Sequence, residues 1–280
     1  MPTVKARDGA TLAYEVHDYT DPWTTPPTLL LQHGFGRTAR FWYNMIPTLS
    51  RHYRVVCPTF RGLGDSAAGV DFKTGLTLDN YLADLDTIID DLGVPAVHYV
   101  GESLGGVIGF AFAATYPARV RTLCVMSAPL YIKSSVEETF AFGHGSWEQA
   151  LEKMGSYEWG KKANAATRFP PGTDPRVLDW YASETGKNRV EALMAMVRFA
   201  MAANVTPLLA RIEAPVLGLY PMAGTVATSE QTQVLKEKIR NFQIVHLPTT
   251  FHMTWMLYPG VCARHILHFI AAHDGIACCD

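Results

Sequence analysis

The sequence of 280 residues contains few cysteines, and they follow no paired spacing. The five are Cys57, Cys124, Cys262, Cys278 and Cys279, an odd number without a C-x-x-C motif. This usage is typical of reduced thiols in a cytoplasmic protein rather than of a disulfide framework. We expect Cys57 and Cys124 to be small core residues of strands, and the last two to lie in a frayed chain end.

Long apolar runs, an excess of positive charge and metal motifs are also missing. No run approaches the roughly 18 apolar residues of a membrane span, and the N-terminus has no signal-peptide core. The net charge is −2, which does not favour nucleic acid or an anionic membrane as a partner. Without an H-E-x-x-H motif, a His/Cys cluster or a phosphate loop, we expect no metal and no cofactor. The expected partner is a small-molecule substrate, and a homodimer is left open.

The apolar pattern that is present predicts an α/β fold. Short apolar runs, such as residues 28–32 and 96–100, alternate with helical periods, such as residues 78–92 and 104–115. Continuous apolar strands are typical of a parallel sheet that is covered on both faces. We predict a doubly wound, mostly parallel sheet of eight strands.

The alternation stops between residues 129 and 207, where the pattern is helical and rich in large apolar side chains. We predict that 129–207 form a helical lid inserted after the sixth strand, and that 1–128 and 208–280 form the core domain. A lid needs a small core of its own and also covers a pocket. The side chains expected to line that pocket are Trp147, Trp159, Met196, Phe199 and Trp255.

One short stretch carries the clearest chemical signal. Gly101-Glu102-Ser103-Leu104-Gly105 follows a predicted strand and precedes a predicted helix. This G-x-S-x-G pattern describes a tight strand-to-helix turn that presents a serine nucleophile. The helix start favours developing negative charge near Ser103. We predict that the backbone N–H of Leu104 forms half of an oxyanion hole, and that of Phe35, in a His-Gly-Phe-Gly loop, the other half.

The sequence contains four motifs: His33-Gly34-Phe35-Gly36, Arg61-Gly62-Leu63-Gly64-Asp65-Ser66, Gly101-Glu102-Ser103-Leu104-Gly105-Gly106 and Phe251-His252. Together they resemble the α/β-hydrolase superfamily. The resemblance is to its lidded branch, which contains 3-oxoadipate enol-lactonase, small carboxylesterases and C–C hydrolases, and it covers nearly the whole chain outside the lid. In this family the histidine base follows the last strand, which implies His252 as the base of Ser103.

The sequence departs from the family pattern at the third member of the triad. Where the family carries an acid after the lid, this chain has Gly224, and the alternative position in the stretch 126–129 has no carboxylate either. Ser127 and Glu230 are the remaining candidates for a group that orients His252. Glu102 adjoins the nucleophile, but neighbouring side chains diverge at such a turn, so we expect it to support the site indirectly.

These observations predict a serine hydrolase that cleaves a carboxylic ester or lactone with an apolar portion and has a non-standard or missing triad acid. Two alternatives remain open. One is C–C bond hydrolysis or cofactor-free oxygenation on the same fold. The other is a non-catalytic protein that binds a small ligand under the lid.

Overall fold

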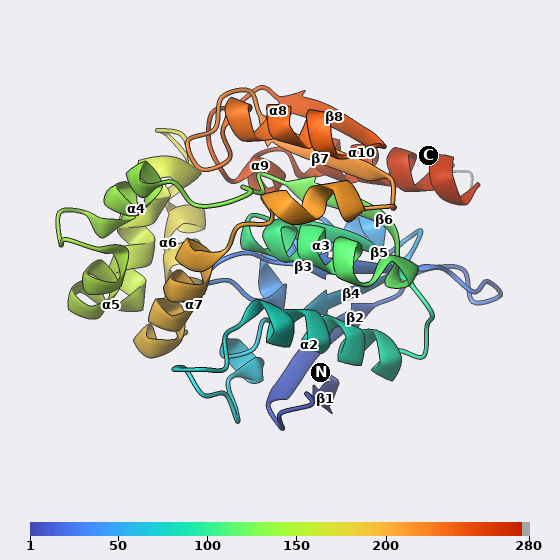
Figure 1. The fold of residues 1–280 in the computed structure, drawn as a ribbon, viewed down its shortest axis with the longest axis horizontal. Helices are drawn as coiled ribbons and strands as arrows, with labels where there is room; N and C mark the ends of the chain where they lie inside the picture. The colour runs from blue at the N-terminus through green and yellow to red at the C-terminus, as the bar shows by residue number, and fades with distance from the viewer. Residues whose placement is uncertain (276–280) are drawn as a thin grey trace.

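The computed structural model describes residues 1–275, so Cys278 and Cys279 lie outside the described residues. Eight strands form one sheet in the order β1-β2-β4-β3-β5-β6-β7-β8 (Figure 1). β2 pairs with β1 and β4 in antiparallel fashion, and the pairs from β4 to β8 are parallel. The predicted eight-stranded sheet is therefore confirmed. The strands are β1 Thr3–Lys5, β2 Thr11–His17, β3 Thr28–Gln32, β4 Arg54–Pro58, β5 Val97–Glu102, β6 Val120–Met126, β7 Val216–Pro221 and β8 Phe242–Leu247.

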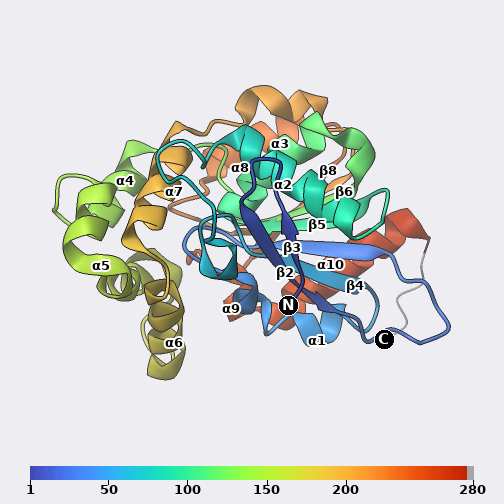
Figure 2. The same cartoon turned by 90° about the horizontal axis from the view of Figure 1, so that it is seen from below.

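Helices cover both faces of the sheet (Figures 1 and 2). One face carries α2 (Leu78–Asp91), α3 (Leu104–Thr115) and α8 (Ser229–Lys238), and the other carries α1 (Ile46–Leu49) and α10 (Pro259–Asp274). A short helix, α9 (Thr254–Leu257), precedes α10. The central strands are buried on both faces because each face packs into its own apolar cluster. Cys57, Cys124 and Cys262 are buried, as the core interpretation of the first two predicts.

The chain between β6 and β7 forms the helical insertion, residues 129–207, which lies beside the sheet (Figure 1). A π-helical turn, Asn164–Arg168, follows α5, and α5 itself is kinked at Gly155, where φ is 74°. Only glycine adopts this backbone conformation without strain. The helices are α4 Ser134–Ala141, α5 Trp147–Ala163, α6 Pro175–Gly186 and α7 Val190–Ala202, and a 3₁₀ turn, Thr206–Arg211, leads to β7.

One helical stretch consists of two short pieces. The pattern over residues 41–49 predicts a helix interrupted at Pro47, and the chain forms a 3₁₀ turn at Ala39–Trp42 and then α1. Pro47 lies in the first turn of α1, where its missing N–H has no intrahelical partner to lose. Among the described residues, no helix is long and apolar enough to cross a membrane.

Candidate active site

Ser103 lies at the tight turn between β5 and α3, and its backbone is strained. Its φ of 51° and ψ of −119° are rare for a residue with a side chain. The turn is held by a hydrogen bond from the Ser103 N–H to the carbonyl oxygen of Met126, at 2.8 Å. It also depends on Gly105, since a Cβ there would overlap the carbonyl oxygen of Gln32 in the neighbouring strand. The local sequence therefore aims the Ser103 side chain away from the sheet at the start of a helix.

Ser103 and His252 line the same pocket. Both are nearly buried, with exposed fractions of 8% and 7%. The pocket lies between the helical insertion and the elbow, and most of its wall is apolar. Its apolar lining includes Val107, Pro129, Ile132, Val136, Phe140 and Trp147, and its charged lining consists of Arg37 and Arg168.

His252 follows β8, and two backbone hydrogen bonds join its loop to the helical insertion. Its backbone N–H donates to the carbonyl oxygen of Thr167 at 2.9 Å, and the next N–H, of Met253, donates to that of Arg168 at 3.3 Å. Burial lowers the pKa of the His252 imidazole well below its usual value, and the positive charges of Arg37 and Arg168 lower it further. The imidazole is therefore neutral at pH 7 and can accept a proton.

Phe35 and Leu104, whose N–H groups form the predicted oxyanion hole, both line this pocket. Leu104 is the first residue of α3, where a backbone N–H has no partner within the helix. The Phe35 loop is anchored by His33, whose Nε2 accepts the Phe60 N–H at 3.0 Å and whose Nδ1 bonds the Gly34 carbonyl oxygen at 2.9 Å. The Phe35 ring packs against Trp147 with centroids 4.9 Å apart. The use of these two N–H groups as an oxyanion hole stays a prediction.

None of the groups considered for orienting His252 is bonded to its ring within residues 1–275. The Ser127 hydroxyl lies 3.2 Å from that of Thr254. Glu230 points away from the site, because its side chain is 67% exposed and pairs with Lys133. At Gly224 a Cβ would lie 2.6 Å from the carbonyl oxygen of Ala227, so the backbone leaves no room for an acid there.

Glu102, next to Ser103, is instead bonded to Arg37. The Nη1 atom of Arg37 donates to both carboxylate oxygens, at 2.5 and 2.7 Å, and the Gly34 N–H donates to the same carboxylate. Arg37 also donates to the Tyr181 hydroxyl at 2.6 Å, which ties the pair to the helical insertion. Glu102 thus fixes the position of the loop that contains Gly34 and Arg37. No motif in the sequence indicates the participation of Arg37.

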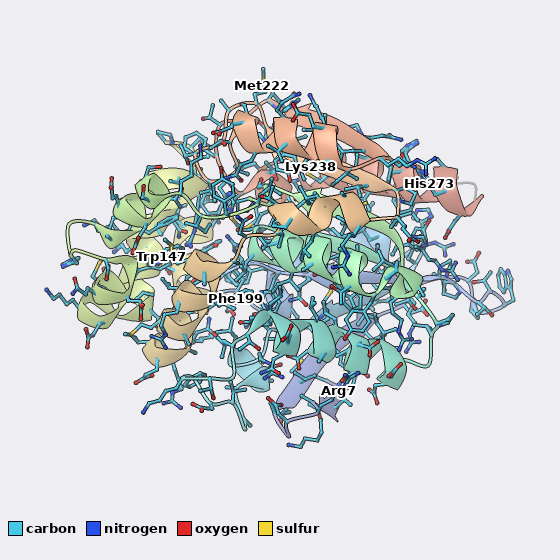
Figure 3. All side chains as sticks on the ribbon, viewed as in Figure 1. Arg7, Trp147, Phe199, Met222, Lys238 and His273 are labelled. Carbon is cyan, nitrogen blue, oxygen red and sulfur yellow. The ribbon has the colours of Figure 1, made fainter. Side chains whose placement is uncertain are left out.

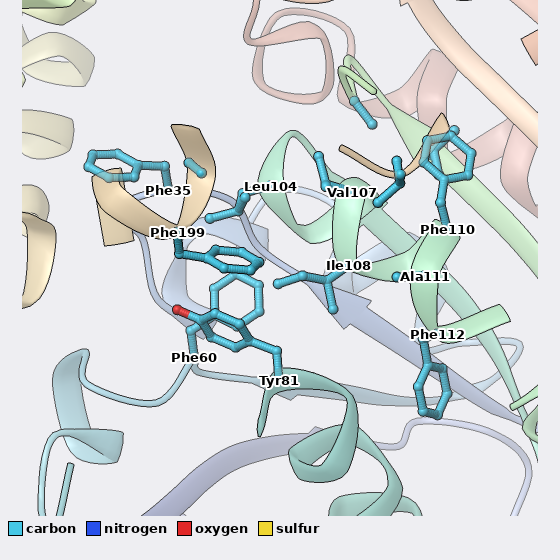
Figure 4. Packing of buried hydrophobic residues seen from close by; sticks show 14 of the residues in the cluster. Phe35, Phe60, Tyr81, Leu104, Val107, Ile108, Phe110, Ala111, Phe112 and Phe199 are labelled. Atoms are coloured by element: carbon cyan, nitrogen blue, oxygen red, sulfur yellow. The ribbon is translucent and has the colours of Figure 1, made fainter. Parts of the chain in front are cut away.

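Of the five aromatic and methionine side chains predicted to line the pocket, only Trp147 does so. Trp159 stacks behind Trp147, with centroids 5.6 Å apart and ring planes at 17°. Phe199 packs on Tyr81 at 4.8 Å, as Figure 4 shows, and Met196 is fully buried in the same cluster. Trp255 packs against Trp42 at 5.9 Å. These four do not line this pocket, because they pack within the apolar clusters of the protein; Figure 3 shows Trp147 and Phe199 on the insertion.

Arg168, at the end of the π-helical turn, is likewise not indicated by any sequence pattern. It lines the pocket although it lies in no recognisable motif. Its position depends on the tertiary fold, which brings the turn against the His252 loop through the two backbone hydrogen bonds of that loop. The charged part of the pocket is therefore a property of the structure rather than of a local pattern.

The strand order and the tight turn at Ser103 between β5 and α3 place the chain among doubly wound α/β proteins. The sequence model of the alpha/beta hydrolase fold matches residues 27–167, and the chain belongs to this family.

Two similar proteins and one similar solved structure are consistent with this family. The chain is 35% identical over 127 residues to the 3-hydroxybutyrate-oligomer hydrolase of Cupriavidus necator, a match that covers 45% of this chain and 43% of that protein. The chain thus spans less than half the length of that relative. It is 28% identical over 253 residues to a probable esterase of Oryza sativa subsp. japonica, covering 87% and 92% of the two chains. The enol-lactonase structure from Burkholderia xenovorans LB400 has a TM-score of 0.83 at 20% identity, covers 96% of this chain and 100% of its own, and shows the shared fold.

Proposed function

We propose that this protein is a serine hydrolase that cleaves a carboxylic ester or lactone with an apolar portion. The observation that carries the proposal is that Ser103, on its strained elbow, shares one largely apolar pocket with the neutral base His252. The relatives named esterase and 3-hydroxybutyrate-oligomer hydrolase support the same reaction class. The apolar wall accounts for the apolar part of the substrate.

In the proposed reaction, the Ser103 hydroxyl oxygen bonds to the carbonyl carbon while His252 takes the hydroxyl proton. The carbonyl oxygen becomes an oxyanion, which the N–H groups of Phe35 and Leu104 stabilise. When the C–O bond to the leaving group breaks, His252 returns the proton to the departing oxygen. Water then attacks the acyl-enzyme, with His252 as the base, and releases the acid and free Ser103.

In the described chain, no acid is hydrogen-bonded to the ring of His252. This observation leaves a second reaction class open. In C–C bond hydrolysis or cofactor-free oxygenation, His252 would remove an acidic proton from the substrate itself, and Ser103 would be secondary. That reaction predicts turnover that persists in Ser103→Ala and is lost in His252→Ala. Oxygen consumption would identify the oxygenase form.

A chromogenic p-nitrophenyl ester tests the proposal in a stopped-flow instrument. We expect a burst of p-nitrophenolate, followed by slower steady turnover as the acyl-enzyme hydrolyses. Ser103→Ala should abolish the burst and the turnover, whereas Ser135→Ala, on the exposed face of α4, should leave both unchanged. A wild-type enzyme that is inert on a broad ester and lactone panel, or activity unaffected by Ser103→Ala, would overturn the proposal.

A further inference from the structure

Three arginines of the described chain are almost fully buried, and one of them has no carboxylate partner. Arg37, Arg61 and Arg168 are 1%, 2% and 3% exposed. Arg37 is bonded to Glu102, and Arg61 is bonded to Asp84 and Asp8. Arg168 forms no ion pair with any residue between 1 and 275. Since a buried guanidinium is strongly disfavoured without an anion beside it, Arg168 is the exception that needs a partner.

The contacts of Arg168 orient its guanidinium but leave its charge uncompensated. Its Nη1 donates to the side-chain oxygen of Asn164 at 3.4 Å, a long hydrogen bond to an uncharged acceptor. Its guanidinium carbon lies 5.1 Å from the ring centre of Trp159 and 4.8 Å from that of Tyr181. Burial lowers the pKa of Arg168 to about 10, which still leaves the side chain charged at pH 7. The side chain is therefore a fixed cation at the pocket wall.

The charges around the pocket do not balance. Arg37 and Arg168 both line it, and both face the same carboxylate, that of Glu102. This carboxylate already accepts hydrogen bonds from Arg37 through both oxygens and from the Gly34 N–H. One positive charge remains, next to Ser103 and His252. A guanidinium presents a planar fork of N–H groups that matches a carboxylate, so the missing anion fits a carboxylate of the ligand.

We propose that the substrate is an ester or lactone that also bears an ionised carboxylate, and that Arg168 binds this carboxylate in the pocket. The inference rests on the proposed function and names the substrate class of the same site. The apolar wall formed by Val107, Val136 and Phe140 then receives the hydrocarbon part of the substrate. The reacting carbonyl lies at Ser103 while the second carboxyl group of the substrate remains unchanged.

Binding of this carboxylate also affects the basicity of His252, whose ring has no hydrogen-bonded acid in the described chain. The charged groups that act on His252 are Arg37 and Arg168, and Glu102 is bonded to the first of them. Both arginines disfavour the imidazolium that forms when Ser103 gives up its proton. A substrate carboxylate on Arg168 compensates one of these charges and makes His252 a stronger base in the substrate complex. The substrate thereby supplies part of the stabilisation that the acid of a triad supplies elsewhere.

Two esters of matched length test the inference: p-nitrophenyl hydrogen glutarate, an anion, and its neutral methyl ester, p-nitrophenyl methyl glutarate. We expect wild-type enzyme to prefer the anion, and Arg168→Gln to lower kcat/KM for the anion by roughly 10- to 100-fold, the range of a charge-assisted hydrogen bond. The neutral ester should change less than about threefold. Arg168→Lys should restore part of the loss. Arg198→Gln, on the exposed surface of α7, serves as the matched control and should change neither ester.

The pH dependence gives a second readout, which a purely structural role of Arg168 would not move. The apparent pKa of kcat, which reports the substrate complex, should be higher for the anionic ester than for the neutral one. In Arg168→Gln this difference should disappear. If Arg168→Gln fails to fold, wild-type enzyme decides: glutarate should inhibit hydrolysis of the neutral ester competitively, and glutaramide should not.

Equal kcat/KM values for the two esters in wild type, or a proportional loss of both in a folded Arg168→Gln, would overturn the carboxylate inference alone. Equal inhibition by glutarate and glutaramide would do the same. A wild-type enzyme inert toward both esters and without a burst would instead overturn the proposed function, and the inference with it. The two failures are therefore distinguishable.

Discussion

The buried pair of Arg37 and Glu102 gives a prediction in which the sign and the size of the effect both follow from the structure. Glu102 is fully buried and accepts three hydrogen bonds, two from Arg37 and one from the Gly34 N–H. Replacing it by leucine leaves the Arg37 guanidinium without a counter-charge. Breaking a buried pair from one side costs about 3–5 kcal/mol, and the orphaned N–H adds roughly 1–3 kcal/mol. A domain whose total stability is about 5–15 kcal/mol would lose a large part of it.

The double variant separates the loss of the pair from the cost of an unpaired charge. Arg37→Met alone should be as damaging as Glu102→Leu, because it leaves a buried carboxylate unpaired. The combination Arg37→Met/Glu102→Leu removes both charges and should be more stable than the sum of the two single effects predicts, with a coupling of about 2–4 kcal/mol. Arg168→Met breaks no ion pair, so the free energy of unfolding should stay equal or rise.

Urea unfolding at pH 7.5, followed by tryptophan fluorescence, measures these free energies from the midpoint and the slope. Single variants within about 1 kcal/mol of wild type, or a double variant equal to the sum of the singles, would contradict the electrostatic reasoning. A loss of stability in Arg168→Met as large as that in Arg37→Met would contradict the inference that the anionic partner of Arg168 is a bound ligand.

Two further predictions concern the loop and the turn at the site. Burial lowers the pKa of His33 to about 3, so below its ordinary value of 6.5 the unfolded chain binds a proton that the folded chain does not. As the pH falls from 6.5 to 3, this group should lower the free energy of unfolding by about 1.4 kcal/mol for each pH unit. The urea midpoint of His33→Asn should therefore depend less on pH between pH 6 and 4 than that of wild type, and an equal dependence would refute this. Gly105→Ala forces a Cβ against the Gln32 carbonyl and should cost about 1–3 kcal/mol and most of the esterase activity, and wild-type values in both assays would show that the turn tolerates a side chain.

Much of the fold follows from local patterns. The apolar run and the glycines around Ser103 predict the helix 104–115, and α3 has these bounds. The central strands are predicted because a strand buried on both faces leaves an uninterrupted apolar run in the sequence. Such signals are local, so a single sequence contains them. The order of the motifs along the chain also indicates His252, which the structure brings to the pocket of Ser103.

The charged half of the site could not be predicted in this way. Arg37 and Glu102 are 65 residues apart, and only the sheet brings them together. Arg168 stands in a π-helical turn, where no periodicity indicates which way a side chain points. The kink at Gly155 has a similar effect on α5, because it rotates one half of the helix relative to the other. Composition therefore indicates that the insertion is aromatic, but it cannot tell that Trp147 lines the pocket while Trp159 packs behind it.

The central claim, that Ser103 is a nucleophile activated by His252, is tested most directly by covalent trapping. The enzyme is treated with a fluorophosphonate, digested, and examined by peptide mass spectrometry. We predict a single phosphonylated residue, Ser103, no adduct in Ser103→Ala, and labelling slowed at least about 100-fold in His252→Asn, the scale of general-base assistance. An unmodified Ser103 in an enzyme that still turns over esters, or an adduct elsewhere that accounts for the lost activity, would contradict the claim.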